Sequence, residues 1–209
     1  LQMESDLADA LAQDQLVLHY QPVVALEDGG IDGVEALLRW QHPERGLVPP
    51  NEFIPLAEAT GHIVPIGRWV LHEACRRVAA WQGEHPHAGR LEVAVNVSMH
   101  QLTRGDLRQD VHDALASSGL DPELLTLELT ESAIADHAEE TAKVLAALRE
   151  DGVRIAIDDF GTGYSSLSYL QRFPVDVLKI DRSFVAGMLD GTQHPAVVRA
   201  IVDLGHTLD

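Results

Sequence analysis

The sequence is poor in basic residues and in aromatic residues. It contains 15 Lys and Arg against 33 Asp and Glu in 209 residues, which gives a formal net charge of −18. This charge repels the phosphate backbone of DNA and RNA and also anionic membrane surfaces, so a nucleic-acid polymer is not an expected partner. If the ligand is a phosphate ester, cations must bridge it to the carboxylates of the protein. The charge balance therefore points to a bound metal.

Long apolar runs and a secretion signal are also absent. No stretch approaches the ~18 consecutive apolar residues of a transmembrane helix, and no signal peptide opens the chain. The single cysteine, Cys75, lies in an apolar helical pattern, and we interpret it as a small core residue in a protein of the reducing cytoplasm. Because the chain begins at Leu1, we expect it to be a piece of a longer protein, and a membrane anchor elsewhere in that parent stays open.

Several common motifs are missing as well. The sequence has no G-x-x-x-x-G-K-[ST], and its 11 histidines include no H-E-x-x-H. The run G-T-G-Y-S-S at Gly161–Ser166 lacks the third glycine of a dinucleotide fingerprint. A nucleotide site built on a glycine loop is therefore not indicated.

From Leu91 onward, strand-like segments alternate with helix-like segments. The predicted strands are Leu91–Ser98, Leu124–Thr130, Val153–Asp158 and Val175–Asp181, and the predicted helices are Asp106–Ser118, Ala138–Glu150, Ser166–Arg172 and Pro195–Leu208. This alternation is typical of an α/β protein with a parallel sheet. With 45% hydrophobic residues, the length suits one large domain.

The first ninety residues are less regular. We predict an amphipathic lead-in helix over residues 1–15, joining an upstream domain, and assign residues 16–209 to the main domain. The other predicted elements are a strand at Leu16–Ala25 broken at Pro22, a strand at Ile31–Trp40, a loop at His42–Pro50, a short helix capped by Asn51 that ends at Ala59 before Gly61, and a helix at about Ile66–Gln82.

Polar residues gather at the predicted carboxyl ends of the strands. In most strands a small residue precedes a polar residue on the same face, as Ala156 precedes Asp158. If these faces line a barrel, the polar groups meet at one mouth of it. The set is Glu35, Asn96, Glu128, Asp158, Asp159, Lys179 and Asp181.

Oxygen donors dominate this set, which suits Mg²⁺ or Mn²⁺. Lys179 is the natural ammonium for a phosphate oxygen or an attacking water. The alternative is that each acid is a solvated turn residue or a member of an ion-pair network. Clustered acids without cations destabilise a fold, which argues against a purely structural role.

Five segments of the sequence stand out as ordered motifs. They read V-E-A-L-L-R-W (Val34–Trp40), N-V-S (Asn96–Ser98), L-E-L-T-E-S (Leu127–Ser132), D-D-F-G-T-G-Y-S-S-L (Asp158–Leu167) and V-L-K-I-D (Val177–Asp181). Together they resemble the EAL domain family of bacterial cyclic-di-GMP phosphodiesterases. The resemblance implies a modified TIM (β/α)8 barrel with an antiparallel first strand. It also implies hydrolysis of one phosphodiester of cyclic di-GMP to linear pGpG.

The resemblance further implies two metal ions, Mg²⁺ or Mn²⁺. Glu35, the glutamate of E-A-L, matches a metal ligand that is essential for catalysis, together with Asn96, Glu128 and Asp158. Asp159 matches a ligand of the second ion.

The remaining site residues are also implied by this resemblance. Lys179 and Asp181 match the positions that orient the attacking water. Glu131 matches a glutamate that steadies the loop after the strand Val153–Asp158. Gln21 and Arg39 match substrate contacts.

The family pattern continues beyond Asp209 with a strand bearing E-G-V-E, a helix and a strand bearing Q-G, so we expect two of about eight barrel strands to be missing from this sequence. The expected partners are cyclic di-GMP, a second copy in a homodimer, and an upstream sensory or GGDEF-type domain. A receptor that binds the dinucleotide without cutting it is the alternative. Because every checkable acid position is filled, we favour the enzyme.

Overall fold

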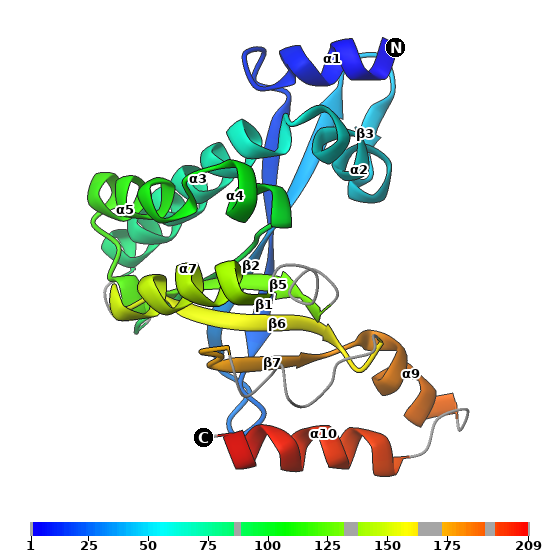
Figure 1. Cartoon of the computed structure of the whole chain (residues 1–209), viewed down its shortest axis with the longest axis vertical. Helices are drawn as coiled ribbons and strands as arrows, with labels where there is room; N and C mark the ends of the chain where they lie inside the picture. Colours follow the sequence, from blue (N-terminus) through cyan, green and yellow to red (C-terminus); the bar gives the residue numbers. More distant parts are fainter. Residues whose placement is uncertain (1, 86–88, 132–137, 163–172, 191–194, 209) are drawn as a thin grey trace. The chain divides into compact units, whose positions relative to one another are not determined.

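Strands and helices alternate along most of the chain, as the sequence predicts (Figure 1). The computed structural model describes residues 2–85, 89–131, 138–162, 173–190 and 195–208. These residues fall into two units, Leu1–Thr126 and Leu127–Asp209, which are described in turn. The predicted helix Ser166–Arg172 and the loop residue Gly163 lie outside the described residues.

The sheet of the first unit begins with an antiparallel pair, which confirms the predicted antiparallel first strand. Strand β1 (Leu16–Val24) pairs antiparallel with β2 (Ile31–His42), and β2 pairs in parallel with β4 (Glu92–Asn96). The short strand β3 (Gly46–Val48) pairs antiparallel with the end of β2. The predicted loop His42–Pro50 therefore contains a strand that the sequence analysis missed.

The predicted break at Pro22 is wrong, because β1 runs through this residue. Pro22 is aligned with Val34 of β2, and the register shifts only between Val23 and Val24. Among the described strands, β1 pairs only with β2. A strand at the edge of a sheet tolerates the missing N–H of proline, because one of its sides has no ladder to support.

Five α-helices and one 3₁₀ turn belong to the described part of the first unit. They are α1 (Gln2–Ala10), α2 (Pro50–Thr60), α3 (Ile63–Glu84), α4 (Met99–Arg104), α5 (Leu107–Ser118) and η1 (Pro122–Leu124). Helices α3 and α5 pack side by side, and α3 also packs on β4 (Figure 1). The helix α4 was not predicted.

The start of α2 differs from the prediction, which assigned Asn51 as its cap. Pro49 precedes the helix with an extended backbone (φ −73°, ψ 150°), and Pro50 is its first residue. Proline suits the first turn because its fixed φ is helical and the N–H that it lacks would have no partner there. Gly61 ends the helix in the left-handed conformation (φ 79°), as predicted.

The core of the first unit forms where α2 and α3 cover the sheet. Trp40 and Phe53 are fully buried with their ring centroids 5.8 Å apart, and Trp40 Nε1 donates a hydrogen bond to Gln15 Oε1 (3.0 Å). The buried carboxylate of Asp110 accepts a hydrogen bond from Arg68 Nε (2.6 Å). This pairing lowers the cost of burying a charge between α3 and α5.

Cys75 of α3 is a core residue, as predicted. Its side chain is fully buried, and burial raises the pKa of its thiol to about 12. Because the thiolate is the reactive form, we expect no measurable reaction with a disulfide reagent at pH 8 in the native protein and rapid reaction in denaturant. Absorbance of the released thiol measures this, and stoichiometric labelling of the folded protein would contradict the assignment.

The second unit continues the alternation of strands and helices. Its elements are β5 (Leu125–Thr130), which begins at the end of the first unit, α7 (Ala138–Glu150), β6 (Arg154–Phe160), β7 (Val177–Ile180), α9 (Arg182–Asp190) and α10 (Pro195–Leu208). The strands follow the order β5, β6, β7, and β6 runs parallel to β7. Helix α10 has the predicted bounds, whereas α9 was not predicted. Within the described residues, no helix combines the length and apolar character needed to cross a membrane.

Candidate active site

In the first unit, Glu35 and Asn96 come together at neighbouring parallel strands. Glu35 of β2 is aligned with Ala94 of β4, two residues before Asn96 at the end of that strand. Asn96 Nδ2 donates a hydrogen bond to Glu35 Oε1 (2.9 Å). This bond turns the amide so that its carbonyl oxygen remains available as an acceptor or a metal ligand. Two of the predicted metal ligands are therefore in contact.

The two predicted substrate contacts also lie on the β1–β2 pair. Gln21 is exposed and directly opposite Glu35, so the two side chains share a face of the sheet. Arg39 is half-buried. It lies on the same face of the sheet as Glu35, because side chains four residues apart in a strand point to the same side. Arg39 Nη1 donates to the carbonyl oxygen of Leu38 (2.8 Å). The β1–β2 pair thus carries the Gln21 amide opposite Glu35, and the Arg39 guanidinium farther along the same face.

In the second unit, Lys179 joins two carboxylates. Lys179 Nζ lies 2.5 Å from Glu128 Oε2 and 3.4 Å from Asp158 Oδ2. The Glu128 side chain is 3% exposed, whereas those of Asp158 and Lys179 are about a quarter exposed. A buried carboxylate is costly unless a cation or hydrogen bonds support it. The ammonium of Lys179, from β7, supplies positive charge beside the acids of β5 and β6.

A β-bulge explains how β6 presents two adjacent aspartates. Ile157 is aligned with Leu178 and Phe160 with Ile180, so Asp158 and Asp159 together stand opposite Lys179. Asp159 has a left-handed backbone (φ 55°), which aspartate tolerates better than most residues. In a regular strand these neighbours would point to opposite faces. The bulge removes that alternation, and the sequence analysis did not predict it.

Asp159 and Asp181 interact, and their pKa values are shifted in opposite directions. Partial desolvation, the charges of Asp158 and Asp181, and a hydrogen bond shared with Asp181 raise the pKa of the Asp159 carboxyl. Hydrogen bonds from the Ser183 hydroxyl and the Ser183 amide (3.0 Å) lower the pKa of Asp181, whose carboxylate caps α9. The Asp181 carboxyl therefore loses its proton at a lower pH than the Asp159 carboxyl. Ser183 is a supporting residue that the sequence analysis missed.

Glu131 lies at the end of β5, where it holds the turn after β6. Its side chain is 5% exposed, and Glu131 Oε2 accepts a hydrogen bond from the Gly161 amide (2.8 Å). Gly161 has φ 98°, and a Cβ there would lie 3.0 Å from the Phe184 ring of α9. Only glycine meets both constraints without strain. The hydrogen bond joins Glu131 to the first residue of the turn after β6, and a role of Glu131 in steadying the loop stays a prediction.

Asp159 is expected to be a destabilising residue in the metal-free protein. Its pKa is raised in the folded state, so its ionised form costs stability at pH 7, and this cost disappears below the unfolded-state pKa of about 4. Asp159→Asn should raise the Tm on the order of 2 °C at pH 7, because interactions of exposed charges are small, and by less near pH 4. Calorimetry in a chelator measures both, with the exposed Asp203→Asn as control. A lower Tm at pH 7 for Asp159→Asn would contradict the repulsion.

The chemistry of the predicted donor residues in each unit suits a hard divalent cation. Carboxylate and amide oxygens are the donors that Mg²⁺ and Mn²⁺ prefer. The repulsion around Asp159 is also what a bound cation would relieve. Within the described residues, no three His, Cys, Asp or Glu side chains stand close enough together to hold an ion, and the Lys179 ammonium lies between Glu128 and Asp158. The oxygen donors are thus of the kind that binds Mg²⁺ or Mn²⁺. In this structure the positive charge next to Glu128 and Asp158 is the Lys179 ammonium.

Comparison with known proteins identifies the class to which the chain belongs. The sequence model of the EAL domain matches residues 4–209. The chain therefore belongs to the EAL domain family, and its α/β fold is the modified TIM barrel of that family. This agrees with the resemblance that the five sequence segments carry.

Two of the similar proteins come from one bacterium. The chain is 49% identical over its whole length to the bifunctional diguanylate cyclase/cyclic di-GMP phosphodiesterase MucR of Pseudomonas aeruginosa, of which it spans 30%. It is 46% identical to the cyclic di-GMP phosphodiesterase NbdA of the same organism, of which it spans 26%. A solved c-di-GMP complex of the PaMucR phosphodiesterase is 50% identical, with a TM-score of 0.92 over the whole chain and 83% of that structure. The chain thus corresponds to about a quarter to a third of these full-length relatives.

Proposed function

We propose that this domain hydrolyses one phosphodiester bond of cyclic di-GMP and releases linear pGpG. The observation that carries the proposal is the position of Lys179, whose ammonium lies against Glu128 and Asp158 while Asp159 shares the same bulge. An ammonium among carboxylates suits a phosphate ester better than a neutral substrate. The relatedness to MucR and NbdA, both named as cyclic di-GMP phosphodiesterases, supports the choice of substrate.

The proposal assigns Mg²⁺ or Mn²⁺, as two ions, to the oxygen donors. Glu35, Asn96, Glu128 and Asp158 would hold the first ion, and Asp159 would contribute to the second. Such ions neutralise charge on the phosphate and lower the pKa of water. Other side chains of the domain, which do not bind the metals, would position the substrate and the water.

Those groups are Lys179, Asp181, Arg39 and Gln21. The Lys179 ammonium stabilises negative charge on the phosphate, and the Asp181 carboxylate accepts a hydrogen bond from the attacking water and orients it. Hydrogen bonds from Ser183 hold Asp181 ionised for this task. Arg39 and Gln21 contact the nucleotide, since a guanidinium binds phosphate as a planar fork.

The same proposal includes the partners of the domain. We place it downstream of a sensory or GGDEF-type domain, in the cytoplasm, and in a homodimer that acts on the loop held by Glu131. The relatives support a further domain in the parent protein. The chain spans only 30% of MucR, which is named for a diguanylate cyclase activity as well.

Chromatography of the products tests the function directly. The protein is incubated with cyclic di-GMP and Mg²⁺, and conversion to pGpG is followed over time. Linear product at a rate that depends on enzyme concentration is the expected result. Binding of cyclic di-GMP by calorimetry without any product would favour the receptor instead. If the protein neither binds cyclic di-GMP nor forms product, both the enzyme and the receptor are contradicted.

A further inference from the structure

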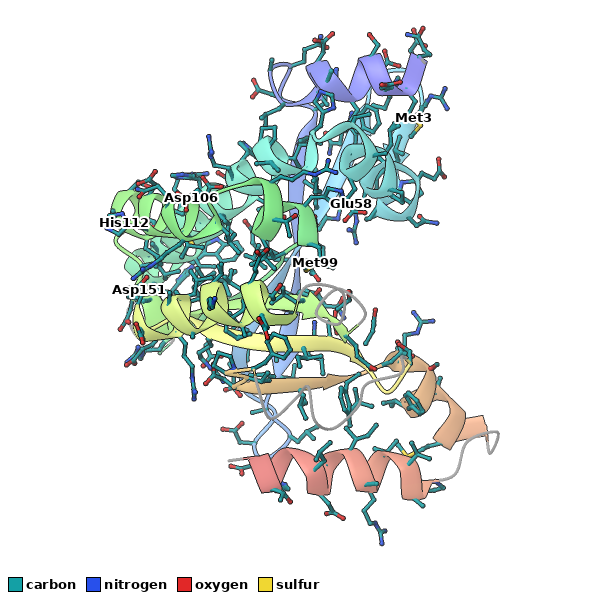
Figure 2. The ribbon with its side chains drawn as sticks, viewed as in Figure 1. Met3, Glu58, Met99, Asp106, His112 and Asp151 are labelled. Carbon is teal, nitrogen blue, oxygen red and sulfur yellow. The ribbon has the colours of Figure 1, made fainter. Side chains whose placement is uncertain are left out.

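The residues that follow Asn96 form a tight connection between β4 and α4. Asn96 is the last residue of β4, and α4 begins three residues later at Met99, which Figure 2 labels. Ser98 lies between them as the N-cap of α4, and its hydroxyl oxygen accepts a hydrogen bond from the His100 amide (3.1 Å). A short connection of this kind transmits the position of the helix to the end of the strand.

Gln101 completes this cap from within the protein. Its side chain is 3% exposed, and Gln101 Oε1 accepts a hydrogen bond from the Ser98 amide (3.1 Å). Ser98 and Gln101 thus form a capping box, in which each side chain satisfies a backbone amide of the helix start. The glutamine of this capping box is buried.

A glycine of α3 makes room for the Gln101 amide. A Cβ on Gly67 would lie 2.1 Å from Gln101 Nε2 and 2.4 Å from Gln101 Cδ. Gly67 is buried inside a helix of 22 residues, where glycine costs about 1 kcal/mol relative to alanine. The close approach of the Gln101 amide is a packing reason for glycine at this position.

We propose that Gln101 is a positioning residue for Asn96, and that the slot at Gly67 fixes the Asn96 amide where it can serve a metal together with Glu35. The inference rests on the proposed function. Gln101 holds the Ser98 backbone against α3, and Ser98 is two residues from Asn96. The Asn96 amide, in turn, is already oriented by its bond to Glu35 Oε1 (2.9 Å). Loss of the Gln101 contact would let the end of β4 move away from Glu35, and ligation would weaken.

Two substitutions remove the contact in different ways. Gln101→Met keeps the length of the side chain but removes the acceptor oxygen. Gly67→Ala leaves Gln101 in place but fills its slot, and because the atoms in the way are at the end of a flexible side chain, the amide is displaced while the helix persists. Gln101→Glu keeps an acceptor oxygen and should rescue the position. Asp106→Ala is the matched control, since Asp106 caps α5 by accepting from the Gln109 amide (3.2 Å) and is labelled in Figure 2.

The measurements are Mn²⁺ affinity, from the electron paramagnetic resonance of free Mn²⁺, and hydrogen exchange of the Ser98 amide without metal. We expect Gln101→Met and Gly67→Ala to lower Mn²⁺ affinity roughly 10-fold or more, as changes in groups that orient metal ligands do. The Ser98 amide should exchange faster in both. Gln101→Glu should keep most of the affinity, and Asp106→Ala should keep all of it despite losing about 1 kcal/mol of stability.

Unchanged Mn²⁺ affinity in Gln101→Met would overturn the inference, and so would an equal loss in Asp106→Ala. The proposed function fails separately, because it needs product from cyclic di-GMP. A protein that binds Mn²⁺ without cutting the dinucleotide would refute the function and still test Gln101 through affinity. A wild-type protein that binds no Mn²⁺ would overturn both.

Discussion

Glu35→Ala should reduce the turnover of cyclic di-GMP by roughly 10³-fold. The substitution removes a proposed metal ligand and the acceptor of the Asn96 hydrogen bond. Metal-ion catalysis contributes several kcal/mol to the transition state, so a loss of about 4 kcal/mol corresponds to roughly a 10³-fold fall in kcat. Initial rates of pGpG formation measure this at saturating substrate.

Glu35→Gln separates charge from shape in this experiment. Glutamine keeps an oxygen acceptor for Asn96 Nδ2, so its Tm should match that of the wild type while its kcat falls as in Glu35→Ala. A fully active Glu35→Gln protein would show that the carboxylate charge is not needed.

Arg39→Ala serves as the contrasting variant, because Arg39 is proposed to contact the nucleotide. Loss of one charge-assisted hydrogen bond of about 1.5–3 kcal/mol should raise KM on the order of 10-fold to 100-fold and change kcat little. Equal losses of kcat with unchanged KM in the alanine variants at Glu35 and Arg39 would refute this division of roles.

Removal of divalent metal should abolish hydrolysis altogether. The proposed ligands are carboxylate and amide oxygens, and the acids around Asp159 repel one another without a cation. We expect a loss of activity of at least about 10³-fold after exhaustive chelation, by the same arithmetic of several kcal/mol. Adding Mg²⁺ or Mn²⁺ should restore it, whereas Ca²⁺ should restore little, since its longer bonds and looser geometry misplace the reacting groups.

Two controls accompany the metal experiment. Calorimetry in the chelator should still show a folded protein, which separates loss of catalysis from unfolding. Binding of cyclic di-GMP in Ca²⁺ should persist without product. Full turnover after exhaustive chelation would exclude the metal-dependent mechanism, and equal rates in Ca²⁺ and Mg²⁺ would exclude the geometric argument.

The sequence predicted most of the fold because its signals are local. Strand and helix alternation, the glycine that ends α2 and the bounds of α10 follow from residue patterns of a few turns. The helix α4 was also present in the sequence as the capping pattern Ser98–Gln101, but its single turn and a half is too short for hydrophobic periodicity to reveal. A search for S-x-x-Q after each strand would have found it.

The features that the sequence did not predict depend on partners in space. Pro22 is allowed because of where β1 lies in the sheet, which no pattern around the proline records. The contacts of the site were predicted only in part. Alternation placed Glu35 and Asn96 on faces that meet, and the structure joins them. The slot at Gly67 and the hydrogen bonds from Ser183 to Asp181 required coordinates.

The bulge in β6 also makes the second aspartate depend on the number of residues in the strand. Asp158 and Asp159 face Lys179 together only because β6 has one residue more than β7 between aligned positions. Deletion of a single codon at this point would let the two strands pair without interruption and would leave one aspartate where there were two. Glu35, Asn96, Glu128 and Lys179 would all remain. Under the proposed function, such a deletion removes a ligand of the second ion, and we expect it to convert a domain that hydrolyses the dinucleotide into one that only binds it.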